Sequence, residues 1–275
     1  MKLEYITSRQ LIEDSLSLAR SIPWGVASRL RGVVGIPRSG LVPAAVIAGA
    51  WNLPLISLDG ESLHGHRPLR SGGRALLLVD DSIYRGRAMT KAEQMVNRWR
   101  SGAVYRAAVY TRSDSIQPDF SCRPVDGRRY FEWNLLGHPD LGRFAFDLDG
   151  VVCEDPTVVD DDGPAYGSHI ASIRPLNLPV VEVGAIITMR LEKWRSVTEA
   201  WLDRHGVSRR EVVMCPAESV AARREMDYGR WKGEQALARG LEVFVESCKR
   251  QAAQIHRTSG LPCICLPEGT VQCRD

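Results

Sequence analysis

Two short apolar runs that end in pairs of acidic residues constrain the fold of this chain more than any other feature. They are Leu76-Leu-Leu-Val-Asp-Asp81 and Phe144-Ala-Phe-Asp-Leu-Asp149. Short, bounded apolar runs are typical of strands buried on both faces of a parallel sheet. The carboxyl ends of such strands are where ligand sites form in α/β proteins. The sequence therefore predicts an α/β protein with two sites, one behind each run.

Strands and helices are expected to alternate along the chain. The expected strands are Gly32–Gly35, Leu53–Leu58, Leu76–Val79, Ala103–Tyr110, Arg143–Phe146, Gly184–Ile187, Val212–Met214, Val243–Val245 and Pro262–Leu266. The expected helices are Ser8–Ala19, Leu41–Ala50, Ala88–Trp99, Lys193–His205, Trp231–Arg239 and Lys249–Ser259. This order predicts two Rossmann-like domains, each with a parallel sheet covered on both faces.

A length of 275 residues exceeds what one core usually serves, which also favours two domains. We expect the first over residues 1–135 and the second over 142–275. Residues 111–141 are rich in Pro, Gly, Asp and Arg, and we interpret them as a linker or docking segment.

The composition excludes several classes of protein. Hydrophobic residues make up 44% and charged residues 25%, which disfavours disorder, and the net charge of +3 does not by itself imply a nucleic-acid partner. The charged N-terminal segment and the lack of a long apolar stretch disfavour secretion and a membrane span. Seven cysteines without a Cys-x-x-Cys pair favour reduced thiols. We expect a cytoplasmic protein, with a homodimer as an open possibility.

The segment from residue 76 to residue 90 combines a buried strand, two acids, a loop with Gly86 and the start of a helix. Loop N–H groups and a helix N-terminus can hold a phosphate. The adjacent carboxylates of Asp80 and Asp81 can accept hydrogen bonds from a ribose diol, or can bind Mg²⁺ carried by a pyrophosphate.

Asp80-Asp-Ser-Ile-Tyr-Arg-Gly86 resembles the donor-binding motif of type I phosphoribosyltransferases, and is particularly similar to its form in amidophosphoribosyltransferases. Val34-Gly-Ile-Pro-Arg-Ser-Gly-Leu41 looks like the pyrophosphate loop of that family, and residues 61–73 fall where the family keeps a loop that closes over the site. The resemblance implies binding of phosphoribosyl pyrophosphate. The residues that would bind it are Arg38, Ser39, Gly40, Asp80, Asp81, Ser82, Tyr84, Arg85, Gly86, Arg87 and Ala88.

The motif departs from the family pattern on its acceptor side. Many members that use a base as acceptor carry an acid at the position of Tyr84 and threonines at the positions of Arg85 and Ala88. Because a tyrosine cannot act as a carboxylate base, an amine, a hydroxyl or an unusual base is as plausible an acceptor as a common purine.

The second acidic pair suits phosphoryl transfer. Alternation along an extended strand puts Asp147 and Asp149 on the same side, so that one can attack phosphorus and the other can protonate the leaving oxygen. Phe144-Ala-Phe-Asp-Leu-Asp-Gly150 resembles the first motif of haloacid dehalogenase (HAD) phosphatases. The resemblance implies Asp147 as nucleophile, Asp149 as acid and base, and Mg²⁺ held by Asp147 and the backbone carbonyl of Asp149.

The other motifs of that family follow in order. Ala185-Ile-Ile-Thr-Met-Arg190 looks like the second motif, with Thr188 binding the phosphoryl group, and Lys232 looks like the charge-balancing lysine, with Lys193 as its rival. Val243-Phe-Val-Glu-Ser247 looks like the fourth, in which Glu246 would complete the metal site. About 38 residues separate Asp149 from Thr188, which leaves no room for a full cap domain.

Together the two resemblances predict a bifunctional enzyme. The first domain would transfer phosphoribose from phosphoribosyl pyrophosphate to an acceptor, and the second would hydrolyse the 5′-phosphate of the product. One alternative is a phosphatase controlled by a nucleotide-sensing first domain. Another is a phosphatase that processes nucleic-acid ends, because the second domain also resembles the phosphatase part of polynucleotide kinases, although the chain has no kinase phosphate loop.

Overall fold

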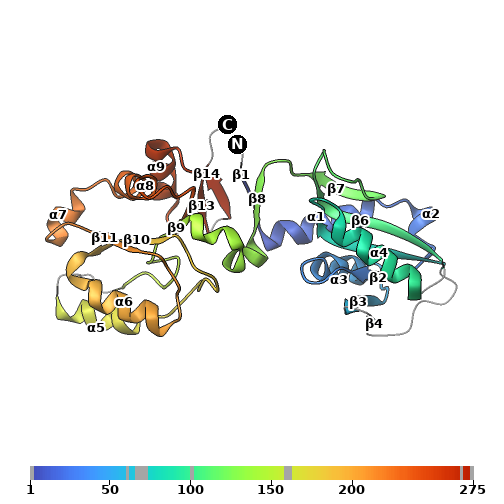
Figure 1. The fold of residues 1–275 in the computed structure, drawn as a ribbon, viewed down its shortest axis with the longest axis horizontal. Coiled ribbons are helices and arrows are strands. Elements are labelled where there is room, and N and C mark those ends of the chain that lie inside the picture. Colours follow the sequence, from blue (N-terminus) through green and yellow to red (C-terminus); the bar gives the residue numbers. More distant parts are fainter. Residues whose placement is uncertain are drawn as a thin grey trace. The chain divides into compact units, whose positions relative to one another are not determined.

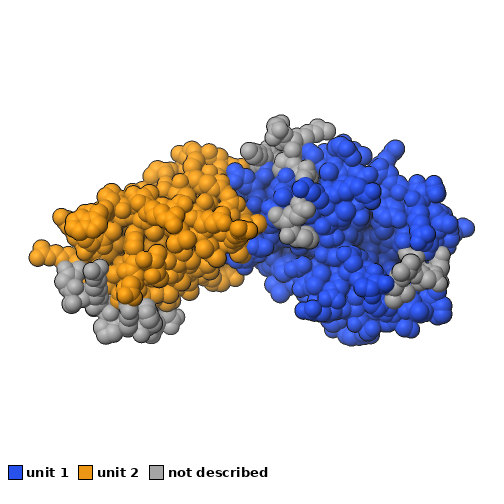
Figure 2. Space-filling model, turned by 180° about the vertical axis from the view of Figure 1, so that it is seen from behind, with its two compact units in different colours: residues 1–5, 128–275 blue, residues 6–127 orange. Residues whose placement is uncertain are grey.

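The computed structural model describes residues 3–59, 62–65, 74–99, 102–157, 163–266 and 269–272. The chain divides into two compact units: unit 1 comprises residues 1–5 and 128–275, and unit 2 comprises residues 6–127 (Figure 2). The segment expected as a linker, residues 111–141, holds the strands β7 (Phe120–Pro124) and β8 (Arg128–Phe131), the 3₁₀ helix η1 (Glu132–Gly137) and the start of a second, η2 (Pro139–Arg143). Unit 2 thus interrupts the sequence of unit 1.

Unit 2 is built on a mostly parallel sheet (Figure 1). Among its described residues, the strand order is β4-β3-β2-β5-β6-β7, with an antiparallel pairing only between β3 and β4. In chain order the elements are α1 (Ser8–Ser21), α2 (Trp24–Ala27), β2 (Leu30–Gly35), α3 (Leu41–Ala50), β3 (Leu55–Asp59), β4 (Ser62–Gly65), β5 (Ala75–Ser82), α4 (Arg87–Trp99), β6 (Ala103–Thr111) and β7 (Phe120–Pro124).

Helices pack on both faces of this sheet because its central strands are apolar throughout. Val34 and Leu78 share a core cluster with Met89 and Val96 of α4. A side chain added at Gly35, which points to the other face, would contact α3. The chain moves from β2 to β3 on one side and then to β5 on the other, so the carboxyl ends of β2 and β5 flank a topological switch point.

Unit 1 contains a second sheet of the same kind and a two-stranded sheet of β1 and β8 (Figure 1). In the part of the chain that the structure describes, the larger sheet has the order β11-β10-β9-β12-β13-β14, antiparallel only at β13 and β14. The elements are β1 (Leu3–Ile6), β8 (Arg128–Phe131), η1 (Glu132–Gly137), η2 (Pro139–Arg143), β9 (Phe144–Phe146), α5 (Pro164–Ser172), β10 (Ala185–Leu191), η3 (Glu192–Trp194), α6 (Arg195–Arg204), β11 (Val212–Cys215), α7 (Val220–Arg224), α8 (Tyr228–Ala238), β12 (Val243–Glu246), α9 (Lys249–Ser259), β13 (Cys263–Cys265) and β14 (Thr270–Gln272).

Alternation along β9 divides the core of unit 1 into two layers. Phe144 and Phe146 lie in a cluster with Trp201 of α6. Ala145 faces the opposite layer, together with Ala236 of α8 and other small apolar side chains of α9. Here the chain turns from β10 and β11 back to β12, so the switch point lies between β9 and β12.

The expected α/β class with parallel sheets is confirmed. The strands that the apolar runs predicted are present, whereas β7 and β8 were expected to be linker. The side chains of β7 are half-buried or exposed, and only Tyr130 and Phe131 of β8 are buried, so neither strand carries the continuous apolar run that marks a central strand. No helix among the described residues is long and apolar enough to cross a membrane.

Candidate functional site

The two loops expected to bind the donor meet at the switch point of unit 2. The Ile36 N–H donates to the Val79 carbonyl at 2.9 Å, which ties the end of β2 to the end of β5. A Cβ atom on Gly40 would lie 2.7 Å from the Ile36 oxygen, 2.8 Å from the Val79 oxygen and 2.9 Å from the Asp80 Cα. Only a glycine fits there, because backbone atoms close the space. The loop that carries Arg38 and Ser39 is therefore held against the strand that carries Asp80.

Asp80 and Asp81 lie at the carboxyl end of β5. Asp81 is buried, with 6% of its surface exposed, and its N–H donates to Asp80 Oδ1 at 2.9 Å. Burial raises the pKa of Asp80 to about 8, and the adjacent Asp81 carboxylate adds to the rise. It is therefore unfavourable to keep Asp80 and Asp81 both ionised in the empty site, and a bound diol or cation would reduce this repulsion.

The helix α4 begins at Arg87, after the loop of residues 83–86 that follows this strand. Gly86 has a φ of +73°, which suits a glycine, and its carbonyl accepts a hydrogen bond from the Thr90 N–H at 2.9 Å. Ser82 is half-buried, while Arg85, Arg87 and Ala88 are exposed around the loop. The exposed N-terminus of α4 leaves its first backbone N–H groups directed at the loop, as in phosphate sites.

Tyr84 lines a surface cavity of unit 2 together with Arg85 and Arg112. The residue is 57% exposed, and the guanidinium carbons of Arg112 and Arg85 lie 4.8 Å and 5.6 Å from the centroid of its ring. Arg112 also donates to Asp114 at 2.7 Å. The cavity measures about 380 Å³. Sequence reasoning missed Arg112, because the arginine lies on the loop after β6 and nothing local to it indicates a site.

Part of the loop expected to close over this site, residues 66–73, lies outside the described residues, including His66 and Arg67. Residues 62–65 form β4, which pairs with β3.

In unit 1, Lys232 links the predicted nucleophile to the predicted metal ligand. Its Nζ donates to Asp147 Oδ2 at 2.8 Å and to Glu246 Oε2 at 2.9 Å. All three side chains are buried. Burial and the neighbouring Glu246 raise the pKa of Asp147 well above its ordinary range, although the Lys232 ammonium opposes the rise. Burial disfavours the lysine charge, but the two carboxylates outweigh it and raise the pKa of Lys232.

Both carboxylate oxygens of Glu246 are in use. Oε2 accepts from Lys232, and Oε1 accepts from the Cys248 N–H at 3.2 Å. Glu246 is fully buried at the end of β12. In this structure Glu246 thus holds Lys232 by a hydrogen bond, and its role as a metal ligand stays a prediction. Lys193, the rival lysine, lies over the Trp194 ring at 5.4 Å.

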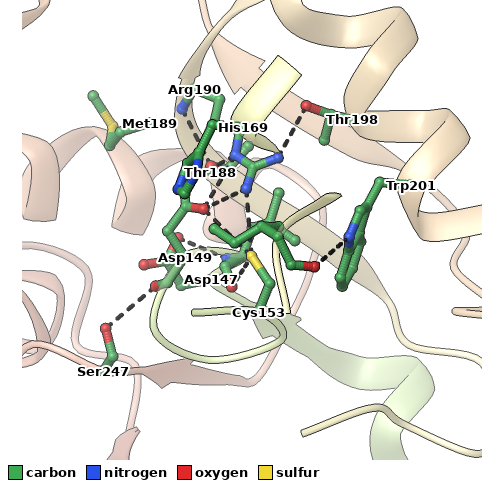
Figure 3. A network of polar contacts seen from close by, with 12 residues as sticks. Asp147, Asp149, Cys153, His169, Thr188, Met189, Arg190, Thr198, Trp201 and Ser247 are labelled. Atoms are coloured by element: carbon green, nitrogen blue, oxygen red, sulfur yellow. Dashed lines mark hydrogen bonds and ion pairs between the residues drawn. The ribbon is translucent and has the colours of Figure 1, made fainter. Parts of the chain in front are cut away.

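The remaining predicted residues of unit 1 lie on β10 and in the segment that follows β9 (Figure 3). Thr188 is fully buried in β10, and its Oγ1 accepts from the Arg190 N–H at 3.2 Å. Asp149 follows β9, and its carboxylate accepts hydrogen bonds from the guanidinium of Arg190. Gly150 has a φ of +76°, which lets the chain turn away directly after the acidic pair.

Asp147, Asp149 and Lys232 line a cavity of about 280 Å³. Thr188 and Glu246 are fully buried and are not part of its lining. Asp155, Ser247 and Arg223 also line it, and sequence reasoning assigned them no firm role. Burial, followed by the nearby Asp149, raises the pKa of Asp155. Asp155 could have been suspected only because it follows the first motif closely.

The donors around Asp147 fit Mg²⁺ in kind. Ser247 Oγ lies 3.4 Å from the Asp149 carbonyl oxygen, and the Asp147 and Asp155 carboxylates line the same cavity. Mg²⁺ takes oxygen ligands and usually keeps several waters. Nevertheless, no group of three or more His, Cys, Asp or Glu side chains within the described ranges has the arrangement of a metal site. The cavity thus offers oxygen donors to Mg²⁺, but its carboxylates are not arranged as a preformed metal site.

Comparison with known proteins gives a partial likeness. No protein-family model matches the chain. A xanthine-guanine phosphoribosyltransferase of Desulfotalea psychrophila is 30% identical over 108 residues, which are 35% of this chain and 65% of that relative. A purine phosphoribosyltransferase structure from Pyrococcus horikoshii covers 48% of this chain and 94% of its own, at 19% identity and a TM-score of 0.38.

A xanthine-guanine-hypoxanthine phosphoribosyltransferase structure from Helicobacter pylori covers 50% of this chain and all of its own, at 15% identity and a TM-score of 0.40. The chain spans slightly less than two thirds of the sequence relative that it matches. The sequence match supports a phosphoribosyltransferase-like domain over part of this chain.

Proposed function

We propose that unit 1 is a phosphatase in which Asp147 is the nucleophile. The observation that carries the proposal is the buried ammonium of Lys232 between Asp147 and Glu246, at 2.8 and 2.9 Å. A cation fixed beside a carboxylate is suited to a site where further negative charge must enter. Asp149 lines the same cavity as Asp147, and Thr188 follows on β10 in the order that the HAD resemblance requires.

The chemistry follows from these positions. An Asp147 oxygen attacks phosphorus, the bond from phosphorus to the leaving oxygen breaks, and Asp149 gives that oxygen a proton. Asp149 then takes a proton from the water that attacks the phosphoaspartate, which releases phosphate and restores Asp147. Thr188 donates a hydrogen bond to a phosphoryl oxygen, and Lys232 offsets the added charge.

Mg²⁺, held by Asp147 and the Asp149 carbonyl, would neutralise charge on the phosphoryl group. The test is phosphate release from p-nitrophenyl phosphate with Mg²⁺ and with chelator, for wild type and for Asp147→Asn. We expect activity only for wild type with Mg²⁺, because an amide cannot be the nucleophile. Equal release by the Asn variant would refute the assignment.

Unit 2, in the same proposal, binds phosphoribosyl pyrophosphate and transfers its phosphoribosyl group. The close approach of Gly40 to Asp80 supports this role, because it joins a loop suited to pyrophosphate to carboxylates suited to the ribose diol. The relative from Desulfotalea psychrophila is named for xanthine and guanine, so purine bases are the first acceptors to test. Amines and hydroxyl compounds belong in the same panel, because Tyr84 stands where many members carry an acid.

The two activities would act in series, so that unit 1 removes the 5′-phosphate of the product formed by unit 2. With the true acceptor, Asp147→Asn should consume phosphoribosyl pyrophosphate and accumulate a product that keeps its phosphate. The double variant Asp80→Asn, Asp81→Asn should lose transfer by about 100-fold or more, while still hydrolysing supplied intermediate. Mass spectrometry of the products checks both. If Asp147→Asn yields the dephosphorylated product, the series is wrong.

A second candidate is a phosphatase controlled by a sensor unit 2. The exposed Tyr84, flanked by Arg85 and Arg112 where a carboxylate would serve catalysis, favours it. Calorimetry distinguishes the two functions. The sensor function predicts that phosphoribosyl pyrophosphate binds tightly and changes the phosphatase rate, and that no acceptor leads to release of pyrophosphate. This result would refute the transferase function.

A further inference from the structure

Arg190 is an almost fully buried arginine, with 1% of its surface exposed, in the middle of the proposed phosphatase site. It lies on β10 two residues after Thr188, so the two side chains leave the strand on the same side. A buried guanidinium is costly unless its N–H groups and its charge are matched. The partners of Arg190 therefore indicate why this position holds an arginine.

Those partners centre on one carboxylate (Figure 3). Nε donates to both Asp149 oxygens at 3.1 Å, and Nη2 donates to Asp149 Oδ1 at 2.5 Å. Nη2 also lies 3.3 Å from Cys153 Sγ, which itself lies 3.4 Å from Asp149 Oδ1. Nη1 lies 3.4 Å from Thr198 Oγ1 on α6. The guanidinium thus contacts α6 on one side and is hydrogen-bonded to the Asp149 carboxylate on the other.

Asp149 nevertheless remains accessible to a substrate. Its side chain is 20% exposed and lines the cavity in front of Asp147. A planar guanidinium that contacts both oxygens fixes the plane of the carboxylate as well as its position. Proton transfer to a leaving oxygen depends on that orientation, since donor and acceptor must come within hydrogen-bond reach.

Building on the proposed phosphatase function, we propose that Arg190 is a positioning residue that orients Asp149 for proton transfer to the leaving group. When the bond from phosphorus to oxygen breaks, Asp149 gives up its proton to that oxygen and becomes anionic, and the guanidinium stabilises the anion. Such an arrangement matters most for esters whose leaving oxygen is strongly basic. The substrate class is therefore alkyl phosphomonoesters, such as sugar phosphates, rather than esters of acidic phenols.

The test compares two substrates that differ in leaving group, ribose 5-phosphate and p-nitrophenyl phosphate. In Arg190→Met we expect kcat for ribose 5-phosphate to fall by about 100-fold or more, in line with the contribution of a positioned general acid. With p-nitrophenyl phosphate we expect a fall of less than about tenfold, because nitrophenolate leaves without a proton. KM should change little for both, and Arg190→Lys should restore part of the rate for ribose 5-phosphate.

The control is Arg174→Met, which removes an arginine with a 76% exposed side chain from the same unit and should leave both rates unchanged. If Arg190→Met proves unfolded by circular dichroism, Thr198→Val takes its place. It removes the contact to Nη1 without changing charge, and should slow ribose 5-phosphate turnover selectively, by about three- to tenfold.

An equal fall for both substrates in a folded Arg190 or Thr198 variant, or no fall in either, would overturn the positioning role alone, provided that Asp147→Asn is inactive. If Asp147→Asn matches wild type, the phosphatase function itself fails, and the role of Arg190 fails with it.

Discussion

Asp80→Asn should stabilise unit 2 while it weakens donor binding. The pKa of Asp80 rises from an ordinary value of 3.8 to about 8, because of burial first and of Asp81 second. Between these values the folded protein binds more protons than the unfolded chain, so the free energy of unfolding falls as pH rises from about 4 to about 8. An asparagine does not titrate and can still accept the hydrogen bond from the Asp81 N–H.

The magnitude follows from the size of the rise. A shift of about four units corresponds to an upper bound of about 6 kcal/mol at pH 8, at about 1.4 kcal/mol per unit. Asp80 is partly exposed and shares its titration with Asp81, so we expect about 2–4 kcal/mol. At pH 5 the gain should be about 1 kcal/mol or less, because pH 5 lies only about one unit above the ordinary pKa of the unfolded chain, and most of the cost builds up between pH 5 and pH 8.

Hydrogen exchange of the amides of β5 is the suitable assay, since it reports the opening of unit 2 rather than the average over both units. Calorimetry with phosphoribosyl pyrophosphate measures the loss of binding on the same sample. Asp114→Asn is the control: its pKa is lowered by the hydrogen bond from Arg112, so its removal should not increase protection at pH 8. A gain of the same size at pH 5 and pH 8, or no gain, would refute this reasoning.

Four further substitutions test the packing of the two units. Lys232→Met leaves two buried carboxylates without their cation, so urea denaturation should show a loss of about 3–5 kcal/mol. Gly40→Ala places a methyl group against backbone atoms and should destabilise unit 2 by about 2 kcal/mol or more, whereas Gly49→Ala, where nothing lies within 4 Å, should stabilise it by about 0.5–1 kcal/mol in the same hydrogen-exchange assay. Trp201→Phe removes the hydrogen bond of 2.9 Å to the Ile173 carbonyl and should cost about 1–3 kcal/mol in urea denaturation.

The site residues whose positions could be predicted from the sequence lie at the ends of central strands. Asp80, Asp147 and Glu246 each follow an apolar run, and parallel strands bring their carboxyl ends to one edge of a sheet. Strand order at the switch points then places Asp147 near Glu246. This inference needs only local pattern and the regular geometry of α/β proteins, which is why it reaches both candidate sites.

Contacts between distant segments could not be placed in this way. Arg190 stood in a motif quoted from the sequence, but its partner Asp149 is 41 residues away in the chain, and only the fold shows that the two meet. The hydrogen bond from Lys232 to Glu246 could not be predicted either, because it depends on how α8 packs against the end of β12. Arg112 lacked any local signal, because it reaches Tyr84 from a separate loop.

The insertion of unit 2 between residues 5 and 128 has a consequence for how the chain folds during synthesis. The strand β1 leaves the ribosome before the rest of unit 1, and its partner β8 is made only after all of residues 6–127. Leu3 and Tyr5 of that strand belong to the core of unit 1, so this core cannot close before the second half of the chain exists. Unit 2 has all of its residues in one continuous stretch and can fold earlier. A fragment that begins at residue 128 would lack β1, and an isolated unit 1 therefore requires residues 3–6 to be supplied, for example by joining them to the other end of the fragment.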